Sequence, residues 1–401
     1  MELIRQTTKK VSSRSLIEVL RVSTKLGLTS FGGPVAHLGY FRDEYVERRK
    51  WLDEKTYADL VALCQFLPGP ASSQVGIAIG MIRAGFLGGI VSWIGFTLPS
   101  VFALTIFAYI LQGVDTSNTG WLHGLMIAAV AVVTQAVWGM AKSLSPDRTR
   151  ASIAIVTAII ALLWSSPLSQ VTIILTAGVF GWLFLPRPSP VEAQPVSVSL
   201  SRRVAIASWI LFFGLLLGLP LLRQFNSLEL LAVFDSFFRV GSLVFGGGHV
   251  VLPLLQAEVV PTGWTTDSQF LAGYGAAQAV PGPLFTFASY LGMTISGAVG
   301  AAVATIAIFL PSFLLITGSL PFWDYIRRRP DFQASLNSIN AAVVGILLAA
   351  LYNPVWIKAI KTGGDFSLAL LAFGLLMFWK LPPWLVVFFC ALGGTALAFF
   401  K

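Results

Sequence analysis

The stretch "QFLPGPASSQVG", residues 65–76, places two prolines around a glycine inside a long apolar segment. A proline within a helix removes a backbone hydrogen bond and clashes with the preceding turn, so this triplet must interrupt the helix that contains it. The same triplet returns in "AAQAVPGPLFTF", residues 276–287, again within an apolar segment. The chain therefore breaks two apolar helices in the same way.

The composition around both triplets is that of a membrane protein. The 401 residues are 56% hydrophobic and only 11% charged, against about 25% charged in ordinary globular domains. Apolar stretches of about 18 residues or more predict membrane-spanning helices, and here they include 86–111, 121–140, 204–222 and 298–320. We therefore expect an all-α polytopic membrane protein.

The net charge of +9 does not indicate nucleic-acid binding. The basic residues cluster in short loops between the apolar stretches, as they do in cytoplasmic loops of membrane proteins. Cys64 and Cys390 both lie in apolar segments and are interpreted as small buried hydrophobes. His37, His123 and His249 have no metal-ligand spacing and are interpreted as polar helix-end residues. No phosphate-binding loop or nucleophile–base arrangement is evident, so we expect neither an enzyme nor a cofactor or metal site.

The two halves of the chain are copies of one unit. "FGGP" at 31–34 aligns with "FGGG" at 245–248, an offset of 214 residues, and "LPS" at 98–100 aligns with "LPS" at 310–312, an offset of 212. A polar stretch rich in proline and serine, 187–203, lies between the copies and is typical of a linker. The predicted domains are 1–186 and 204–401. Further matched pairs are Lys25 with Arg239, Glu44 with Glu258, Trp51 with Trp264, Gln65 with Gln278, and Ser73 with Thr286.

Basic residues in matched loops predict that the two copies are inverted. The loop 42–55 holds five Lys and Arg residues, whereas its partner 256–268 holds none. Because basic loops stay in the cytoplasm, these loops should lie on opposite sides of the membrane. After the first PGP we count spans near 86–111, 121–141, 151–165, 167–185 and 204–222. The FGG and PGP segments either cross fully or re-enter; re-entry keeps 42–55 in the cytoplasm and is the arrangement we favour.

Broken helices in a membrane predict a binding site for an anion. A backbone break in hydrocarbon is tolerated only where it is buried in protein or lines a wet cavity, and half-helix N-termini carry unpaired N–H groups that attract anions. The alternative is that the glycines and prolines only kink helices or allow tight packing. The predicted site comprises the FGG and PGP residues with two hydroxyls: Gly32, Gly33, Gly246, Gly247, Pro68, Gly69, Pro70, Ser73, Pro281, Gly282, Pro283 and Thr286.

Four charged residues next to the breaks complete the candidate site. Lys25 and Arg239 each lie six residues before an FGG motif, and two cations suit a divalent anion. The alternative is that they extend to the lipid headgroups. Glu44 and Glu258 are candidates for coupling, by binding a proton or pairing with the cations; the alternative is that both are solvated loop carboxylates.

These motifs together resemble a known family. The segment "SFGGPVAHLGYFRDEYVERRKWLDEKTYADLVALCQFLPGPASSQVGIAIG", 30–80, is similar to the chromate ion transporter family, and "FGGGHVVLPLLQAEVV", 245–260, followed by GW and QAVPGP, resembles that family's second domain. One departure is Gly248, which stands where the first copy has Pro34. The family's FGG and PGP positions carry over to the glycines and prolines named above.

The resemblance implies a transporter in the bacterial inner membrane, with several spans, that exports chromate and confers chromate resistance. Chromate and sulfate are both tetrahedral dianions, so the alternative is a carrier or channel for sulfate or another oxyanion. The partners implied are a chromate- or sulfate-like oxyanion and the lipid bilayer, without nucleic acid. The oligomeric state is open, with a homodimer as one candidate.

Overall fold

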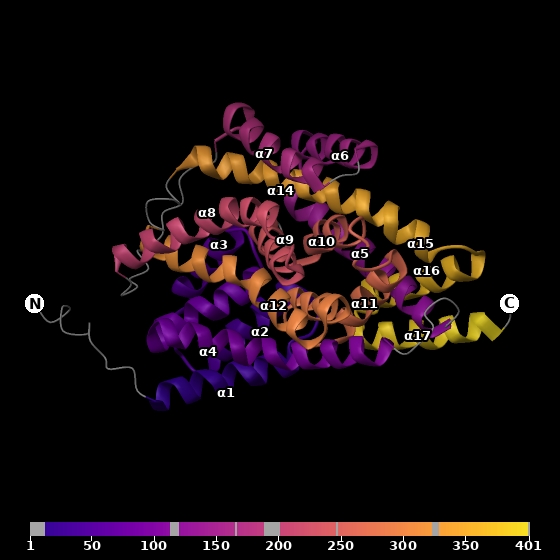
Figure 1. The fold of residues 1–401 in the computed structure, drawn as a ribbon, viewed down its shortest axis with the longest axis horizontal. Helices are drawn as coiled ribbons and strands as arrows, with labels where there is room; N and C mark the ends of the chain where they lie inside the picture. The colour runs from indigo at the N-terminus through magenta and orange to yellow at the C-terminus, as the bar shows by residue number, and fades with distance from the viewer. Residues whose placement is uncertain are drawn as a thin grey trace, which may run out of the picture.

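The computed structural model describes residues 13–112, 120–164, 167–187, 201–245, 248–322 and 329–399. Helices and short connections make up these ranges, and no strand occurs within them. Five of the helices are long and apolar enough to cross a membrane. The protein is an all-α polytopic membrane protein, elongated in the view of Figure 1.

The order of helices repeats once along the chain. The first copy comprises α1 (Ser13–Thr29), α2 (Gly33–Arg42) with a π-helical turn (Asp43–Arg48), α3 (Glu54–Phe66), α4 (Ala71–Leu111), α5 (Gly120–Leu144), α6 (Arg148–Leu163) and α7 (Pro167–Phe184). The helix α8 (Arg202–Phe225) follows. The second copy comprises α9 (Glu229–Leu243), α10 (Val251–Val259), α11 (Asp267–Ala279), α12 (Phe287–Ser319), α14 (Pro330–Ala350), α15 (Ile357–Ala359), α16 (Gly363–Met377) and α17 (Pro383–Phe399). The region 151–185 thus forms two helices rather than one.

The long helices α4 and α12 each fold back on themselves at a matched glycine. Gly85 has φ 65° and Gly297 has φ 63°, and the residue before each is also non-helical. Around the first bend the backbones of Gly80 and Gly88 touch, so a side chain at either position would overlap its neighbour. Gly292 and Gly300 make the equivalent contact. Each helix is therefore two arms, 71–83 and 86–111 in α4, and 287–295 and 298–319 in α12.

Ion pairs show that the FGG and PGP segments form helical hairpins whose connecting turns lie inside the molecule. Glu44, just after α2, is bound by Lys25 of α1 at 2.7 Å, so α2 runs back along α1. Arg83, at the end of the first arm of α4, binds Glu18 of α1 at 3.0 Å. The α3–α4 hairpin therefore returns to the same end of the molecule as the α1–α2 hairpin. This is the re-entrant arrangement favoured from the sequence.

The second copy runs in the opposite direction across the molecule. Gln112, which follows the second arm of α4, donates to the carbonyl of Met293 at 3.2 Å, three residues before the bend of α12. The arm from residue 86 to 111 rises about 40 Å at 1.5 Å per residue. The bends of α4 and α12 consequently lie at opposite ends of the molecule, which is the geometry of inverted repeats.

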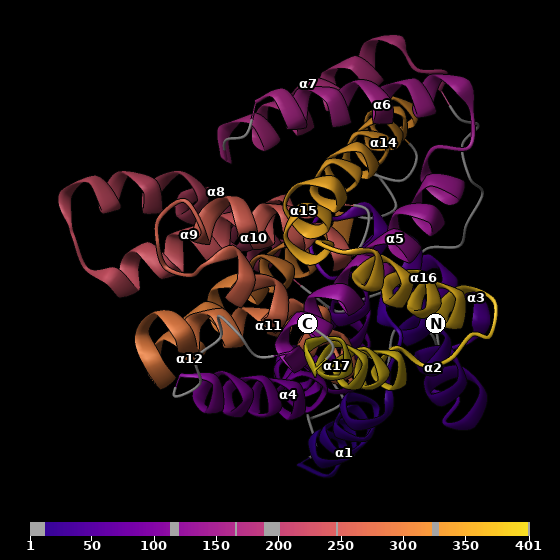
Figure 2. The ribbon, with the colours of Figure 1, turned by 90° about the vertical axis from the view of Figure 1, so that its right-hand side faces the viewer.

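The two copies exchange their C-terminal helices. Helices α16 and α17 of the second copy pack on α5 of the first, while α6 and α7 of the first pack on α14 of the second. Figure 2 shows α6 and α7 lying along α14. The contacts are made through small residues, which let backbones approach closely: Gly124 meets the carbonyl of Cys390, and Gly345 meets the carbonyl of Ala154. Cys390 and Cys64 are both buried and free.

Candidate anion-binding site

The hairpin tips of the two copies meet through reciprocal backbone hydrogen bonds. We call residues 31–33 the first FGG turn and residues 68–70 and 281–283 the first and second PGP turns; the second FGG motif, 245–248, is only partly described. The amide of Gly69 donates to the carbonyl of Val244 at 2.7 Å, and the amide of Gly282 donates to the carbonyl of Ser30 at 2.8 Å. Each PGP turn is therefore bound to the residue that precedes the FGG motif of the other copy.

The conformation of the turns requires glycine. Gly32, Gly33, Gly69 and Gly282 have φ of 94°, 79°, 121° and 97°, values that residues with a side chain rarely adopt. Space is also restricted, because a Cβ atom at Gly69 would lie 2.7 Å from the hydroxyl of Ser312, and one at Gly282 would overlap the hydroxyl of Ser100. Ser100 and Ser312 are the LPS serines, each again from the other copy. Gly246 and Gly247, also predicted for the site, lie outside the described residues.

A helix begins directly after each PGP turn. Pro70 precedes the first arm of α4, while Pro283 precedes a short 3₁₀ turn (Leu284–Thr286) that leads into α12. Thr286 donates its hydroxyl to the carbonyl of Pro283 at 2.7 Å, whereas the matched hydroxyl of Ser73 has no hydrogen-bond partner among the described residues. The first copy thus offers an unsatisfied hydroxyl at a positive helix end, and the second copy does not.

Lys25 and Arg239 occupy matched ion pairs at the hairpins. Lys25 binds Glu44 at 2.7 Å, and Arg239 binds Glu258 through two hydrogen bonds of 2.7 and 2.9 Å. Arg239 also binds the buried Asp235 at 3.1 Å. Of the alternatives left open by the sequence, pairing of the glutamates with the cations is the one observed. Each cation therefore binds a carboxylate on the other arm of its own FGG hairpin, and the ion pair links the two arms.

Glu44 is held by more than one cation. Its side chain is only 6% exposed, and Arg49 binds it at 2.9 Å in addition to Lys25. Burial opposes ionisation, but the hydrogen bonds from Lys25 and Arg49 outweigh it and lower the pKa of this carboxyl below its usual value. Glu44 is therefore ionised at neutral pH and is not a solvated loop carboxylate.

The histidines are placed differently from the sequence interpretation. His37 lies in the middle of α2, is buried, and contacts Ser72 of α4 at 3.3 Å. His249 lies opposite the first FGG turn, with its Nε2 atom 3.6 Å from the Cβ position of Gly33. His123 binds the buried carboxylate of Asp365 at 2.9 Å, which links α5 to α16. Aligning the two copies did not single out His37 and His249, because these histidines stand at unmatched positions. They approach one another only through the inverted packing of the copies.

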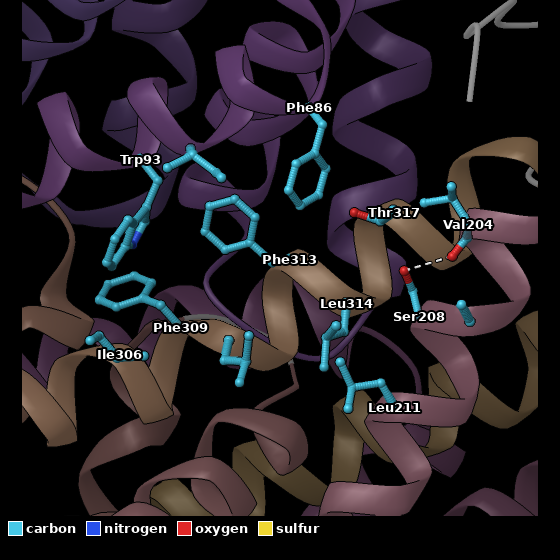
Figure 3. A pocket seen from close by; sticks show the side chains of 13 residues that line it. Phe86, Trp93, Val204, Ser208, Leu211, Ile306, Phe309, Phe313, Leu314 and Thr317 are labelled. Carbon is cyan, nitrogen blue, oxygen red and sulfur yellow. Dashed lines mark hydrogen bonds between the residues drawn. The ribbon is translucent and has the colours of Figure 1, made fainter. Parts of the chain in front are cut away.

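A large cavity elsewhere lacks the chemistry for an oxyanion. It has a volume of about 500 Å³ and lies between α4, α8 and α12 (Figure 3). The aromatic side chains of Phe86, Trp93, Phe309 and Phe313 line it, and its hydroxyl groups are those of Ser208 and Thr317. Ser208 donates to the carbonyl of Val204 within its own helix. Without a charged group this cavity suits apolar molecules, so the glycine turns remain the candidate anion site.

Inverted repeats with helices broken near the middle of the membrane are found in many membrane transporters. The model of the chromate transporter family matches residues 17–182 and 231–395, and the chain belongs to that family. It is 32% identical to the chromate transport protein of Pseudomonas aeruginosa over 80% of this chain and 77% of that one. It is 28% identical to the chromate transport protein of Cupriavidus metallidurans (95% and 92% covered) and 28% identical to a probable chromate transport protein of Synechococcus elongatus (95% of both). No solved structure matches the chain.

Proposed function

We propose that the protein exports chromate, a tetrahedral divalent oxyanion, across the cytoplasmic membrane by secondary active transport, and so confers chromate resistance. The observation that carries this proposal is the pair of reciprocal hydrogen bonds, from Gly69 to Val244 and from Gly282 to Ser30, that joins each PGP turn to the residue before the FGG motif of the other copy. The amides of Gly69 and Gly282 are used by these hydrogen bonds, so the groups left for an anion are the helix N-termini that follow the PGP turns and the hydroxyl of Ser73. The names of the relatives support chromate as the anion.

The inverted copies supply a route for alternating access. In this mechanism one inverted unit moves against the other around a central site, which opens first to one side and then to the other. The hydrogen bonds that join the turns come from different copies, so movement of one copy against the other changes the site itself. The proposed site consists of the glycine turns with Ser73 and Thr286.

Lys25 and Arg239 complete the proposal as the source of positive charge. A dianion in a partly dehydrated site needs compensating charge, because burying it alone is prohibitive. We assign Glu44 and Glu258 as the coupling groups, which hold the cations when the hairpins are closed and release them when a hairpin opens. The matched ion pairs at 2.7 Å in both copies support this assignment.

Uptake by everted membrane vesicles tests the proposal. Vesicles that contain the protein, energised by respiration, should accumulate labelled chromate against its gradient, and collapse of the gradient should stop accumulation. A vesicle preparation without the protein is the control. Accumulation of sulfate with exclusion of chromate would establish a sulfate carrier instead, and downhill flux alone would establish a channel.

A further inference from the structure

His37 presents one unsatisfied ring nitrogen at the centre of the molecule. The side chain is 1% exposed, and its Nδ1 atom contacts the hydroxyl of Ser72 at 3.3 Å. Its Nε2 atom is buried and makes no hydrogen bond of good geometry among the described residues, although the backbone of Ser30 lies beside the ring. Phe96 packs edge-on against the ring, with 5.6 Å between ring centres. A buried polar atom without a partner costs free energy, so its retention here points to a ligand.

His249 faces the same region from the other copy. Its Nδ1 atom lies 2.9 Å from the hydroxyl of Tyr274, which fixes the ring. Its Nε2 atom points at Gly33, where the absence of a side chain leaves access to the backbone of the first FGG turn. His37 lies one helical turn after Gly33 on α2, so the two imidazole rings approach the start of this helix from opposite copies. The hydroxyl of Ser73, next to Ser72, is also without a partner among the described residues.

The chemistry of the two rings suits a tetrahedral oxyanion. Each Nδ1 atom is held by a hydroxyl, so each Nε2 atom is the one left to bind a ligand. A neutral imidazole can donate one N–H, and a protonated imidazole donates two and adds a positive charge. Two protonated rings would repel one another, but a dianion between them neutralises both charges.

We propose that His37 and His249 bind the transported oxyanion through their Nε2 atoms, and that protonation of these rings raises the affinity. The proposal rests on the proposed function, and it deepens it by naming two side chains that bind the anion and a protonation that controls the affinity. The titratable side chain that faces the rings among the described residues, apart from the rings themselves, is Tyr274. Affinity is expected to be high at acidic pH, and deprotonation of the rings lowers it as pH rises.

Equilibrium binding of labelled sulfate to the purified full-length protein tests this inference. Sulfate stays a dianion between about pH 4 and 8, a range that covers both free imidazole and imidazole whose pKa is lowered by burial, so any pH dependence comes from the protein; chromate is measured in parallel. We expect the parent protein to bind roughly tenfold more weakly at the higher pH, the effect of losing a charge-assisted hydrogen bond. His37→Gln and His249→Gln should each reduce this pH dependence, and the double variant should abolish it.

The chain supplies matched controls. His123→Gln removes a histidine that binds Asp365 between α5 and α16, away from the glycine turns, and should leave the pH dependence intact. Glutamine places an amide near Nε2 and asparagine near Nδ1, so His37→Gln should retain more binding at high pH than His37→Asn. A purely structural role would weaken binding by both without changing its pH profile. Thermal unfolding of each variant verifies that it is folded.

The outcomes separate the inference from the function on which it rests. If the parent protein binds neither sulfate nor chromate, the proposed function fails and the inference fails with it. If the parent binds an oxyanion and the double histidine variant binds it with the same affinity and pH profile, only the inference is overturned.

Discussion

Gly69 and Gly282 have φ of 121° and 97°, and each donates its amide to the opposite copy. A side chain at either position would strain the backbone and collide with an LPS serine. Backbone strain of this kind costs about 1–3 kcal/mol per residue. At the scale of single residues, Gly69 and Gly282 therefore hold the PGP turns against the opposite copy. A small side chain added at either position should displace its turn.

Gly69→Ala and Gly282→Ala should each reduce chromate transport by more than about tenfold, since strain of roughly 1.4 kcal/mol or more displaces the turn from its position. Membrane insertion should persist, because the long apolar helices are unchanged. Gly214→Ala in α8 is the matched control, since no atom lies within 4 Å of the Cβ position there. Transport in everted vesicles, normalised to protein level, measures the effect. Parent-like transport by both variants would show that the PGP turns only shape packing.

The sequence predicted the breaks themselves but not the histidines beside them. Proline and glycine act locally, so Pro68 to Pro70 could be placed from the chain alone. His37 and His249 occupy unmatched positions, and their meeting depends on which faces of two inverted hairpins pack together. The hydrophobic periodicity of a single segment does not show which of its faces packs against a distant hairpin.

At the scale of elements, α1–α2 and α9–α10 are two hairpins closed by equivalent ion pairs. Lys25 and Glu44 belong to one, and Arg239 and Glu258 to the other. Both carboxylates are largely buried, with side chains 6% and 11% exposed. Removing Arg239 leaves the carboxylate of Glu258 without its ion-pair partner, which is more damaging than removing the whole pair, whereas removing Lys25 still leaves Glu44 bound to Arg49.

Lys25→Gln should lower both the melting temperature and the oxyanion affinity, the latter by roughly 1.5–3 kcal/mol if a charge-assisted hydrogen bond is lost. Arg239→Gln should do the same. The double variant Arg239→Gln with Glu258→Gln should recover part of the melting temperature but not the affinity, because one buried carboxylate is gone while the positive charge is still missing. Lys25→Arg should keep more function than Lys25→Gln. Recovery of affinity in the double variant would show that Arg239 only closes the hairpin.

The ion pair at Glu44 predicts how stability depends on pH. The pKa of Glu44 is lower in the folded protein than its ordinary value of 4.5. Its contribution is therefore fully present above that ordinary value and is lost as pH falls through the folded pKa. Thermal unfolding between about pH 7 and 3.5 should show a steeper loss for the parent than for Glu44→Gln. Equal slopes for the two proteins would contradict a stabilising role for this carboxylate.

The whole molecule is an inverted pair of copies, and the fold could be predicted from the sequence only in part. Composition predicted the spanning helices, and 86–111 matches the second arm of α4. The loop 42–55 is rich in Lys and Arg and the matched loop 256–268 has none, and this difference predicted that the two copies are inverted. The exchange of α6 and α7 for α16 and α17 was not predictable, because apolar helices in a membrane choose partners by backbone fit at small residues rather than by hydrophobic pattern.

Cysteine labelling should detect the inversion in intact membranes. Single cysteines at Glu47 and Thr262, both exposed, are introduced into a background that lacks Cys64 and Cys390. We expect a membrane-impermeant reagent to label Thr262→Cys from outside the cell and Glu47→Cys only after the membrane is opened, because basic loops stay in the cytoplasm. Labelling of both cysteines from the same side would rule out the inverted arrangement.

The exchange of helices between the copies also constrains how such a chain can arise. A lone copy would leave the surface of α5 that receives α16 and α17 uncovered, and its own α6 and α7 would have no α14 to contact. A one-unit ancestor therefore needed a second molecule, inserted upside down in the same membrane, to complete its fold. Gene fusion through one added crossing helix, α8, would then fix one unit in each orientation.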